Sequence, residues 1–399
     1  MPTESSAEVR VHVHGVAIGG DGVGRDESGR VVFVAGALPG EQVSARIRTE
    51  HARFAHADVD QVHEPSPHRI APPCPHLLAG CGGCGFGHVD VAEQRRLKVA
   101  MITEALERIG HVEAPVVLAG PDLEPAGFRT TVRVALVSGR AGFRAAHGHQ
   151  RIPVDSCRVS HPLVEDVLRS GRFGDNDEAV LRVGARTGER LAVVSPSTAG
   201  VELPPDVLVV GSGELRGGRR ARFHEIVGGV RLRISAESFF QSRPDGAEAM
   251  VDLVAEALVG VAPDAPMVDL YCGVGLFAAI VGPGRPVVAV ERARSSVADA
   301  RHNLRELDAK VVRSSVERWT PSAAAAVVAD PPRRGLGREG VAKVGATGAA
   351  RLALVSCDAG SLGRDAGLLA AAGWRHVQST LVDLFTDTPH VEVVSRFDR

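Results

Sequence analysis

Apolar and polar residues alternate along the first part of the chain. Valines at positions 9, 11 and 13 are separated by Arg and His, which is the period of a β-strand. Glycines follow between residues 15 and 24, and apolar segments return at Val31–Val34 and Gln42–Ile47. Short strands separated by Gly and Pro predict a small β-barrel. Residues 64–75 are rich in Pro and mark a linker.

The middle of the chain has a mixed pattern. Apolar residues recur at helical spacing over Val91–Ile109, and strand-like alternation follows at Thr131–Val137 and Ala192–Val194. This mixture predicts an α+β insert, without indicating its topology.

From about residue 226 the pattern becomes regular. Apolar segments typical of buried strands occur at Met267–Tyr271, Pro286–Val290, Ala325–Val328 and Leu352–Ser356. Helical patterns lie between them, notably Ser295–Leu307 and Leu362–Ala372. Strands that alternate with helices predict a doubly wound parallel sheet. We therefore expect an α/β protein with three domains, at residues 1–66, 67–225 and 226–399.

Composition agrees with a globular protein of this size. The chain has 399 residues, 44% of them hydrophobic and 24% charged, which excludes a disordered protein. No apolar stretch reaches the roughly 18 residues of a membrane span. The first ten residues lack the basic and apolar regions of a signal peptide, so we expect a cytoplasmic protein. Six cysteines in such a protein point to metal binding or catalysis rather than disulfides.

A glycine-rich turn is predicted to follow the first strand of the sheet. The segment Val-Asp-Leu-Tyr-Cys-Gly-Val-Gly-Leu-Phe spans residues 268–277, and its glycines allow a ligand to approach the backbone. The next strand leads to Glu291, whose carboxylate can accept hydrogen bonds from a ribose. Because G-x-G-x-x-G is absent, this resembles the S-adenosylmethionine site of class I methyltransferases more than a dinucleotide site. An ordinary glycine turn of an α/β sheet is the alternative.

Three reactive side chains follow later strands. Asp330 stands in Val-Ala-Asp-Pro-Pro-Arg-Arg-Gly, where Arg333 replaces the aromatic residue typical of amino-group methylation. Cys357 comes directly after a strand, as a nucleophile at the sheet edge would, although such a cysteine is often only a small buried residue. Glu392 lies in Val-Glu-Val-Val, where it could simply be an outward-facing strand residue.

In this order the motifs resemble the RNA uracil-5-methyltransferase family. Asp-Pro-Pro-Arg, Ser-Cys and the C-terminal His-Val-Glu match that family's motifs, and Glu-Ser-Phe-Phe-Gln (237–241) resembles its cofactor-contacting segment. The N-terminal module, with Gly-Gly-Asp-Gly-Val-Gly and Ala-Leu-Pro-Gly-Glu, resembles its TRAM barrel. The resemblance implies a Rossmann-like class I methyltransferase domain behind a TRAM/OB-like barrel and a central insert.

The resemblance also implies roles for individual residues. Cys357 matches the nucleophile that adds to C6 of uracil, and Glu392 matches the base that removes the C5 proton. The residues that match contacts to S-adenosylmethionine are Gln241, Tyr271, Glu291 and Asp330. The chain departs from the family after the nucleophile, where Asp358 and Ala359 replace the common Asn-Pro. A charged Asp358 would raise the pKa of Cys357 unless its side chain points away.

A second group of cysteines precedes the helix expected at 91–109. Cys74, Cys81 and Cys84 stand on a Gly/Pro-rich loop, and Cys157 lies far downstream. Four thiolates suit an iron–sulfur cluster or zinc, and the resemblance implies the ligands of a [4Fe–4S] cluster, with zinc as the less favoured alternative. The family usually has five residues in the first gap, whereas this chain has six. Four unrelated buried cysteines are disfavoured by the Cys-Gly-Gly-Cys segment.

The expected partner is RNA, as a single-stranded loop with a uridine flipped into the site. TRAM plus four cysteines resembles the 23S ribosomal branch, so we expect rRNA rather than tRNA. A tRNA 5-methyluridine enzyme and a catalytically inactive, cluster-bearing RNA-binding protein are the alternatives. Residues 1–72 hold seven Arg and ten acidic residues, so phosphate contacts are expected elsewhere. The candidates are Arg95, Arg96, Lys98 and the arginines of 219–222, each of which could also be a solvated surface residue.

Overall fold

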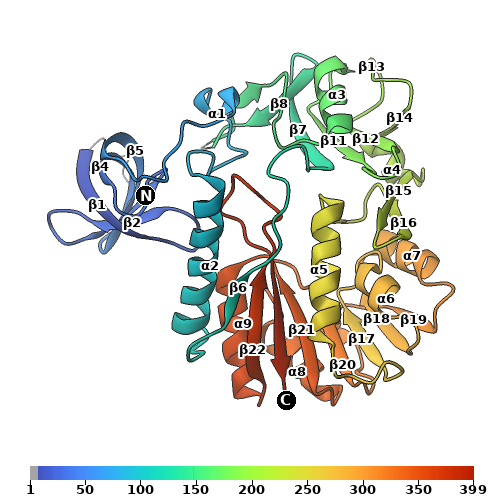
Figure 1. The fold of residues 1–399 in the computed structure, drawn as a ribbon. Coiled ribbons are helices and arrows are strands. Elements are labelled where there is room, and N and C mark those ends of the chain that lie inside the picture. Colours follow the sequence, from blue (N-terminus) through green and yellow to red (C-terminus); the bar gives the residue numbers. More distant parts are fainter. Residues whose placement is uncertain (1–7, 147) are drawn as a thin grey trace.

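The computed structural model describes residues 8–146 and 148–399. Figure 1 shows a small barrel, a central domain and a helix-flanked sheet that ends in the C-terminus. The barrel is closed, with strand order β1-β2-β3-β5-β4, as the alternation of its sequence predicts, and Val and Ala side chains fill its interior. Its strands are β1 (Glu8–Val16), β2 (Gly22–Arg25), β3 (Val31–Ala35), β4 (Gln42–Glu50) and β5 (Phe54–Glu64).

The central domain is built on a six-stranded sheet with the order β14-β12-β11-β7-β8-β9. Helix α3 (Pro162–Ser170) buries its apolar side against this sheet. The strands are β7 (Thr131–Val137), β8 (Arg140–Arg144), β9 (Arg151–Pro153), β11 (Glu178–Val183), β12 (Arg190–Ser195) and β14 (Val207–Gly211). The smaller elements are α1 (Pro75–Leu78), β10 (Arg172–Phe173), β13 (Val201–Glu202) and α4 (Ser212–Arg216).

The C-terminal domain holds an eight-stranded sheet with the order β19-β18-β17-β20-β21-β23-β22-β6. The five strands from β19 to β21 are parallel, and β23 is antiparallel to both neighbours. The eight strands are β6 (Val117–Ala119), β17 (Met267–Leu270), β18 (Val287–Glu291), β19 (Ala309–Arg313), β20 (Ala326–Ala329), β21 (Arg351–Ser356), β22 (Arg375–Leu381) and β23 (Val393–Asp398). This is the Rossmann-like architecture of class I methyltransferases, as the sequence predicts.

Helices cover both faces of this sheet. They are α5 (Pro244–Ala257), α6 (Leu276–Val281), α7 (Arg294–Asn303), the short 3₁₀ turn η1 (Val316–Arg318), α8 (Gly337–Ala346) and α9 (Ala359–Ala371). A hairpin of β15 (Arg222–Val227) and β16 (Val230–Ser235) leads into the domain. Among the described residues, no helix combines the length and apolarity needed to cross a membrane.

An early segment of the chain packs with the C-terminal domain. Helix α2 (Val91–Arg108) lies beside α9, and β6 (Val117–Ala119) pairs with β22 at the sheet edge (Figure 1). Ile102 and Leu106 of α2 join the core on this side of the sheet. Gly363 permits the close approach, since a Cβ there would lie 2.4 Å from the Ala105 carbonyl oxygen. The expected boundary between residues 225 and 226 falls inside β15, so the three sequence segments differ from the packing units.

Candidate active site

A cavity of about 560 Å³ lies at the carboxyl ends of the parallel strands. Tyr271 directly follows β17, Glu291 ends β18, Asp330 follows β20 and Cys357 follows β21. Parallel strands bring these positions to one edge of the sheet. The residues expected for cofactor binding and catalysis all line this cavity, namely Gln241, Tyr271, Glu291, Asp330, Cys357 and Glu392.

The glycine turn leaves room for a ligand beside a fixed carboxylate. Gly273 and Gly275 have φ values of 55° and 89°, which favour glycine. A Cβ on Gly273 would meet no atom within 4 Å. The Gly273 N–H donates to Glu291 Oε2 over 3.1 Å, and the N–H groups of residues 292 and 293 donate to Oε1 over 2.7 Å. The Glu291 carboxylate is therefore held at the mouth of an open backbone turn.

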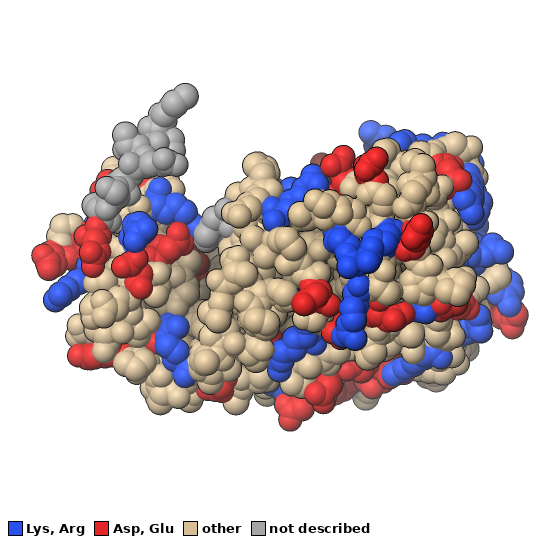
Figure 2. Space-filling model, turned by 90° about the horizontal axis from the view of Figure 1, so that it is seen from above, with Lys and Arg blue, Asp and Glu red and all other residues tan. Residues whose placement is uncertain are grey.

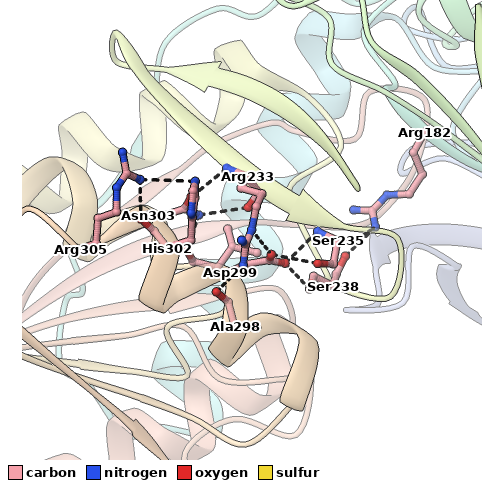
Figure 3. A network of polar contacts seen from close by, with 10 residues as sticks. Arg182, Arg233, Ser235, Ser238, Ala298, Asp299, His302, Asn303 and Arg305 are labelled. Carbon is pink, nitrogen blue, oxygen red and sulfur yellow. Dashed lines mark hydrogen bonds and ion pairs between the residues drawn. The ribbon is translucent and has the colours of Figure 1, made fainter. Parts of the chain in front are cut away.

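Two buried charges hold the turn that leads to Gln241 (Figure 3). Asp299 of α7 accepts hydrogen bonds from the Arg233 guanidinium, from the N–H and hydroxyl of Ser235, and from the Ser238 hydroxyl, over 2.7–2.9 Å. Arg182 of β11 donates to the carbonyl oxygens of residues 235, 236 and 238 over 2.7–3.1 Å. Because residues 239–241 follow directly and line the cavity, this polar network sets their position.

The residue after Cys357 explains the departure from the usual Asn-Pro. Asp358 is the N-cap of α9, and its side chain accepts a hydrogen bond from the Ser361 N–H over 2.7 Å. Ala359 occupies the first helical position, where Pro is also tolerated. Burial raises the pKa of Cys357 to about 12, with further increases from Glu392 and Asp330 and only the smallest from Asp358. The Asp358 side chain caps α9, so the replacement of the usual Asn-Pro by Asp358-Ala359 does not indicate a loss of catalysis.

Glu392 is a buried carboxyl group in the cavity wall. It directly precedes β23, and only 3% of its surface is exposed, so the alternative of an outward-facing strand residue is wrong. Within the described residues its carboxyl group makes no hydrogen bond. Burial raises the pKa of Glu392 well above its usual range, and the charge of Asp330 adds to this while Arg333 opposes it. Burial also raises the pKa of Asp330 to about 7.

The loop before Glu392 brings two further side chains into the cavity wall that sequence reasoning missed. Phe385 and His390 line the cavity and pack edge to face, with ring centroids 6.1 Å apart. Both belong to the segment 383–392 that carries the family motif, so their position in that segment could have predicted that they line the site. Lys98 anchors the loop, because its Nζ donates to Asp383 Oδ1 over 2.6 Å and to the Phe385 carbonyl oxygen over 3.0 Å.

The basic residues expected to contact RNA phosphates differ in how exposed they are and in whether they form ion pairs. The prediction that Lys98 contacts phosphate is wrong, since its side chain is fully buried in the ion pair with Asp383. Arg95 is largely buried and paired with Asp122, and Arg96 is exposed but paired with Glu93. Of the arginines in 219–222, Arg219 pairs with Glu214, while those at 220 and 222 are exposed. On the face seen in Figure 2, basic and acidic side chains are interspersed, so no field of one sign covers it.

The four cysteines expected to bind a metal cluster line a second cavity, of about 440 Å³. Its wall includes Cys74, Cys81, Cys84 and Cys157. Burial raises the pKa of Cys84 to about 12, and nearby Asp387 adds to the increase. In the described parts of the chain, no three His, Cys, Asp or Glu side chains are arranged to hold one metal ion. The thiols of these cysteines are soft donors of the kind that bind zinc or iron–sulfur clusters. Cys272, by contrast, is a small buried residue packed in the core of the C-terminal domain.

Comparison with known proteins agrees with this geometry. A TRAM domain model matches residues 2–59. The chain is 35% identical to an uncharacterized RNA methyltransferase of Streptomyces coelicolor, over 97% of this chain and 92% of that protein. It is 32% identical to the 23S rRNA (uracil(1939)-C(5))-methyltransferase RlmD of Pseudomonas entomophila, over 98% of this chain and 93% of that protein.

A solved structure shares the whole fold. The crystal structure of Pyrococcus abyssi tRNA (uracil-54, C5)-methyltransferase, in complex with S-adenosyl-L-homocysteine, matches with a TM-score of 0.74. The match covers 98% of this chain and 99% of that one, at 22% identity. The likeness extends over barrel, central domain and C-terminal domain.

Proposed function

The chain belongs to the RNA methyltransferase family that includes the 23S rRNA uracil-C5 methyltransferases, and from this membership we propose that it methylates C5 of a uridine in RNA. The observation that carries the proposal is the presence of a thiol, Cys357, and a buried carboxyl group, Glu392, in the wall of one cavity. RNA binding alone requires neither group. Uracil-C5 methylation requires both a nucleophile and a base.

S-adenosylmethionine is the proposed methyl donor, and the residues present fit it. The cavity volume lies within the roughly 300–1,000 Å³ of small-molecule sites. Glu291 would accept hydrogen bonds from ribose hydroxyl groups beside the open turn at Gly273, and Gln241, Tyr271 and Asp330 would complete the binding wall. When bound, this cofactor supplies an electrophilic methyl group on a positively charged sulfur.

Cys357 activates the uracil in the proposed reaction. Its thiolate forms a bond to C6, and the electron pair of the C5–C6 double bond moves toward O4, which makes C5 nucleophilic. After C5 has gained its methyl group, the Glu392 carboxylate takes the C5 proton. The electrons of that C–H bond re-form the double bond and expel the thiolate, so Cys357 is regenerated.

The environment of Glu392 suits this task. A carboxylate whose pKa is raised by burial is a stronger proton acceptor, once ionised, than a solvated one. Arg333 lines the same cavity, and its charge opposes the rise in the pKa of Glu392.

We further propose that the four cysteines hold a [4Fe–4S] cluster with a structural role. Three of them come from one Gly-rich loop and the fourth from residue 157, so a bound cluster would join these two segments. The proposed methyl transfer contains no electron-transfer step, which leaves the cluster no part in the chemistry. Zinc is the alternative, because thiolates also bind it.

Ribosomal RNA is the proposed substrate, with an unpaired uridine flipped into the cavity. Support comes from two relatives, 30% and 32% identical over at least 95% of this chain, that are 23S rRNA uracil-C5 methyltransferases. The tRNA enzyme of Pyrococcus abyssi matches as much of the chain at only 22% identity. A tRNA substrate is the alternative. We expect the enzyme to work in the cytoplasm, where its RNA is.

The decisive experiment uses 5-fluorouridine-substituted fragments of 23S rRNA and of tRNA with S-adenosylmethionine. Fluorine does not leave as a proton does, so the reaction should stop at a covalent protein–RNA adduct. Peptide mass spectrometry should find the RNA, with a transferred methyl group, on Cys357. No adduct with either RNA, from protein that binds the cofactor, would refute the proposal.

Three variants separate the roles. Cys357→Ala should form no adduct, whereas Cys272→Ala, which removes the other thiol in the cavity wall, should still form it. Glu392→Gln should accumulate a methylated adduct with ordinary uridine RNA, because the C5 proton stays in place. Turnover should fall by about 10²- to 10⁴-fold. If Glu392→Gln turns over normally, another group is the base.

A further inference from the structure

The barrel carries its large aromatic side chains on the outside. Its only two phenylalanines, Phe33 and Phe54, lie on β3 and at the start of β5, while Val and Ala fill the interior. Residues 32, 34, 55 and 57 point inward and are fully buried, so the alternation of both strands turns residues 33, 54 and 56 outward. Aromatic rings normally dominate cores. Here the two phenylalanine rings lie outside the barrel and do not contribute to its core.

Four rings form one continuous surface, which we call the ring platform (Phe33, His51, Phe54 and His56). Phe33 stacks on His56 with centroids 5.2 Å apart, and His51 stacks on Phe54 at 4.4 Å. The two stacks meet edge to face, with Phe33 and Phe54 6.0 Å apart. A turn closed by the His51 N–H and the Phe54 carbonyl oxygen fixes the last pair. His51 is exposed and the other three rings are half-buried.

The ring platform lies near the catalytic cavity along a short series of contacts. His56 Nδ1 is 4.0 Å from Asp21 Oδ2. The neighbouring Gly20 packs so closely on Pro389 that a Cβ there would lie 2.4 Å from the Pro389 Cβ. Pro389 directly precedes His390, which lines the cavity. Nucleotides on either side of a uridine in that cavity can therefore reach the barrel.

Charge decides what kind of contact the barrel can make. Seven Arg against ten acidic residues in positions 1–72 make it net negative, which disfavours binding through phosphates. Rings that reach the surface, even half-buried ones, can stack on nucleobases without an ion pair, because every base has a flat π-face. A protein partner fits less well, since stable interfaces need about 20–30 residues on each side. Charged residues also flank the rings in the sequence, with Arg30 just before β3, Glu50 at the end of β4 and Arg53 just before β5.

We propose that the ring platform is a stacking site for unpaired nucleotides that flank the target uridine. The inference rests on the proposed function for the identity of the RNA, and it adds a second contact outside the catalytic cavity. Stacking, rather than ion pairing, carries this contact. Its contribution to RNA affinity is therefore nearly independent of salt, unlike that of arginine–phosphate contacts.

The test uses full-length protein and fluorescein-labelled oligouridylate of about 20 nucleotides, longer than the roughly 4–16 nucleotides that one OB-type barrel covers. The double variant Phe33→Leu/Phe54→Leu keeps apolar side chains on the strands and removes the flat rings. Fluorescence anisotropy should give a Kd about tenfold weaker than that of the parent, as expected for one lost base stack. The ratio of the two Kd values should be the same at low and high salt.

The matched control is His12→Ala/His14→Ala, which changes two exposed side chains of β1. This strand pairs with β2 and β4 and lies away from the β3–β5 pair in the barrel. The control should bind oligouridylate as the parent does. His51→Ala, in an exposed turn, provides a second platform variant should the double variant fail to fold, and it should weaken binding in the same salt-independent way.

Methylation kinetics separate this inference from the proposed function. With rRNA fragments that carry unpaired nucleotides beside the target, the platform variants should raise KM about tenfold and leave kcat unchanged. With fragments trimmed of those nucleotides, parent and variants should be equal. Equal Kd values for parent and platform variants, or a loss that disappears at high salt, would overturn the inference even if methylation is intact. A parent that binds through the platform and methylates no RNA would instead refute the proposed function.

Discussion

The ion pair between Lys98 and Asp383 links the first long helix to the loop that carries Glu392. The side chains are 0% and 4% exposed, and Nζ lies 2.6 Å from Oδ1. Burial lowers the pKa of Lys98, and the charge of Asp383 opposes this decrease without cancelling it. The protein therefore spends free energy to bury this charge. We predict that Lys98→Met is strongly destabilising, because it leaves Asp383 buried without its partner.

The magnitude follows from the geometry. Removing one member of a buried pair costs about 3–5 kcal/mol, whereas replacing both by apolar groups is close to neutral. Lys98→Met also removes the donor to the Phe385 carbonyl oxygen, so we expect a loss of about 4 kcal/mol in the free energy of unfolding. Lys98→Met/Asp383→Leu should recover most of this, to within about 1 kcal/mol of the parent. In the single variant kcat should also fall, because the loop that carries Glu392 loses its anchor.

Urea unfolding followed by tryptophan fluorescence measures this domain directly. Both tryptophans, Trp319 and Trp374, are buried in the core that includes α2 residues. The control is Arg108→Met on the same helix, which breaks an exposed pair with Glu104 and should cost less than about 0.5 kcal/mol. The reasoning is refuted if Lys98→Met costs no more than this control. It is equally refuted if the double variant is as unstable as the single one.

Three further predictions concern the cofactor, the nucleophile and the cysteine cavity. Asp299→Asn should weaken S-adenosylhomocysteine binding about tenfold in calorimetry, because charge-assisted hydrogen bonds of about 1.5–3 kcal/mol hold the turn before Gln241. Asp308→Asn, which changes an exposed carboxylate, is the control. Unchanged binding in both variants would contradict the positioning role of Asp299. The value of kcat/KM should rise at least tenfold per pH unit between about pH 6 and 8. Only the thiolate of Cys357 reacts, and its pKa of about 12 keeps it mostly protonated in that range, while Glu392, whose pKa burial also raises, must lose its proton to act as the base. A flat profile would contradict the raised pKa of the thiol. Cys81→Ser should lower the iron and sulfide content of anaerobically purified protein to near zero, whereas Cys272→Ala should keep both; zinc in place of iron in the parent would favour the alternative metal.

The sequence predicted the barrel and the α/β sheet because both rest on local periodicity. Valines alternating with polar residues in β1, and apolar strands alternating with helices after residue 226, are patterns a chain displays before it folds. The positions directly after strands were also predictable. Carboxyl ends of parallel strands meet at one edge, so residues such as Glu291 and Cys357 were expected to come together, and both line the cavity.

Other features depend on contacts between distant segments, and no local pattern reveals them. Lys98 has the sequence context of a solvated surface residue, and only the packing of α2 against the C-terminal loop buries it beside Asp383. Glu392 carries the same sequence signal whether it faces solvent or a cavity. The placement of β6 on the far edge of the catalytic sheet likewise follows from pairing with a strand about 260 residues later.

The chain by itself therefore determined the barrel, the alternating strands and helices after residue 226, the order of its motifs and the chemical type of each candidate residue, since these depend on local spacing and side-chain chemistry. The tertiary structure decided which of those residues share a cavity, which charges are buried, and that the barrel turns its phenylalanines outward. The physical reason is that burial, pairing and pKa arise from neighbours brought together by folding, and these neighbours lie tens to hundreds of residues apart in the sequence.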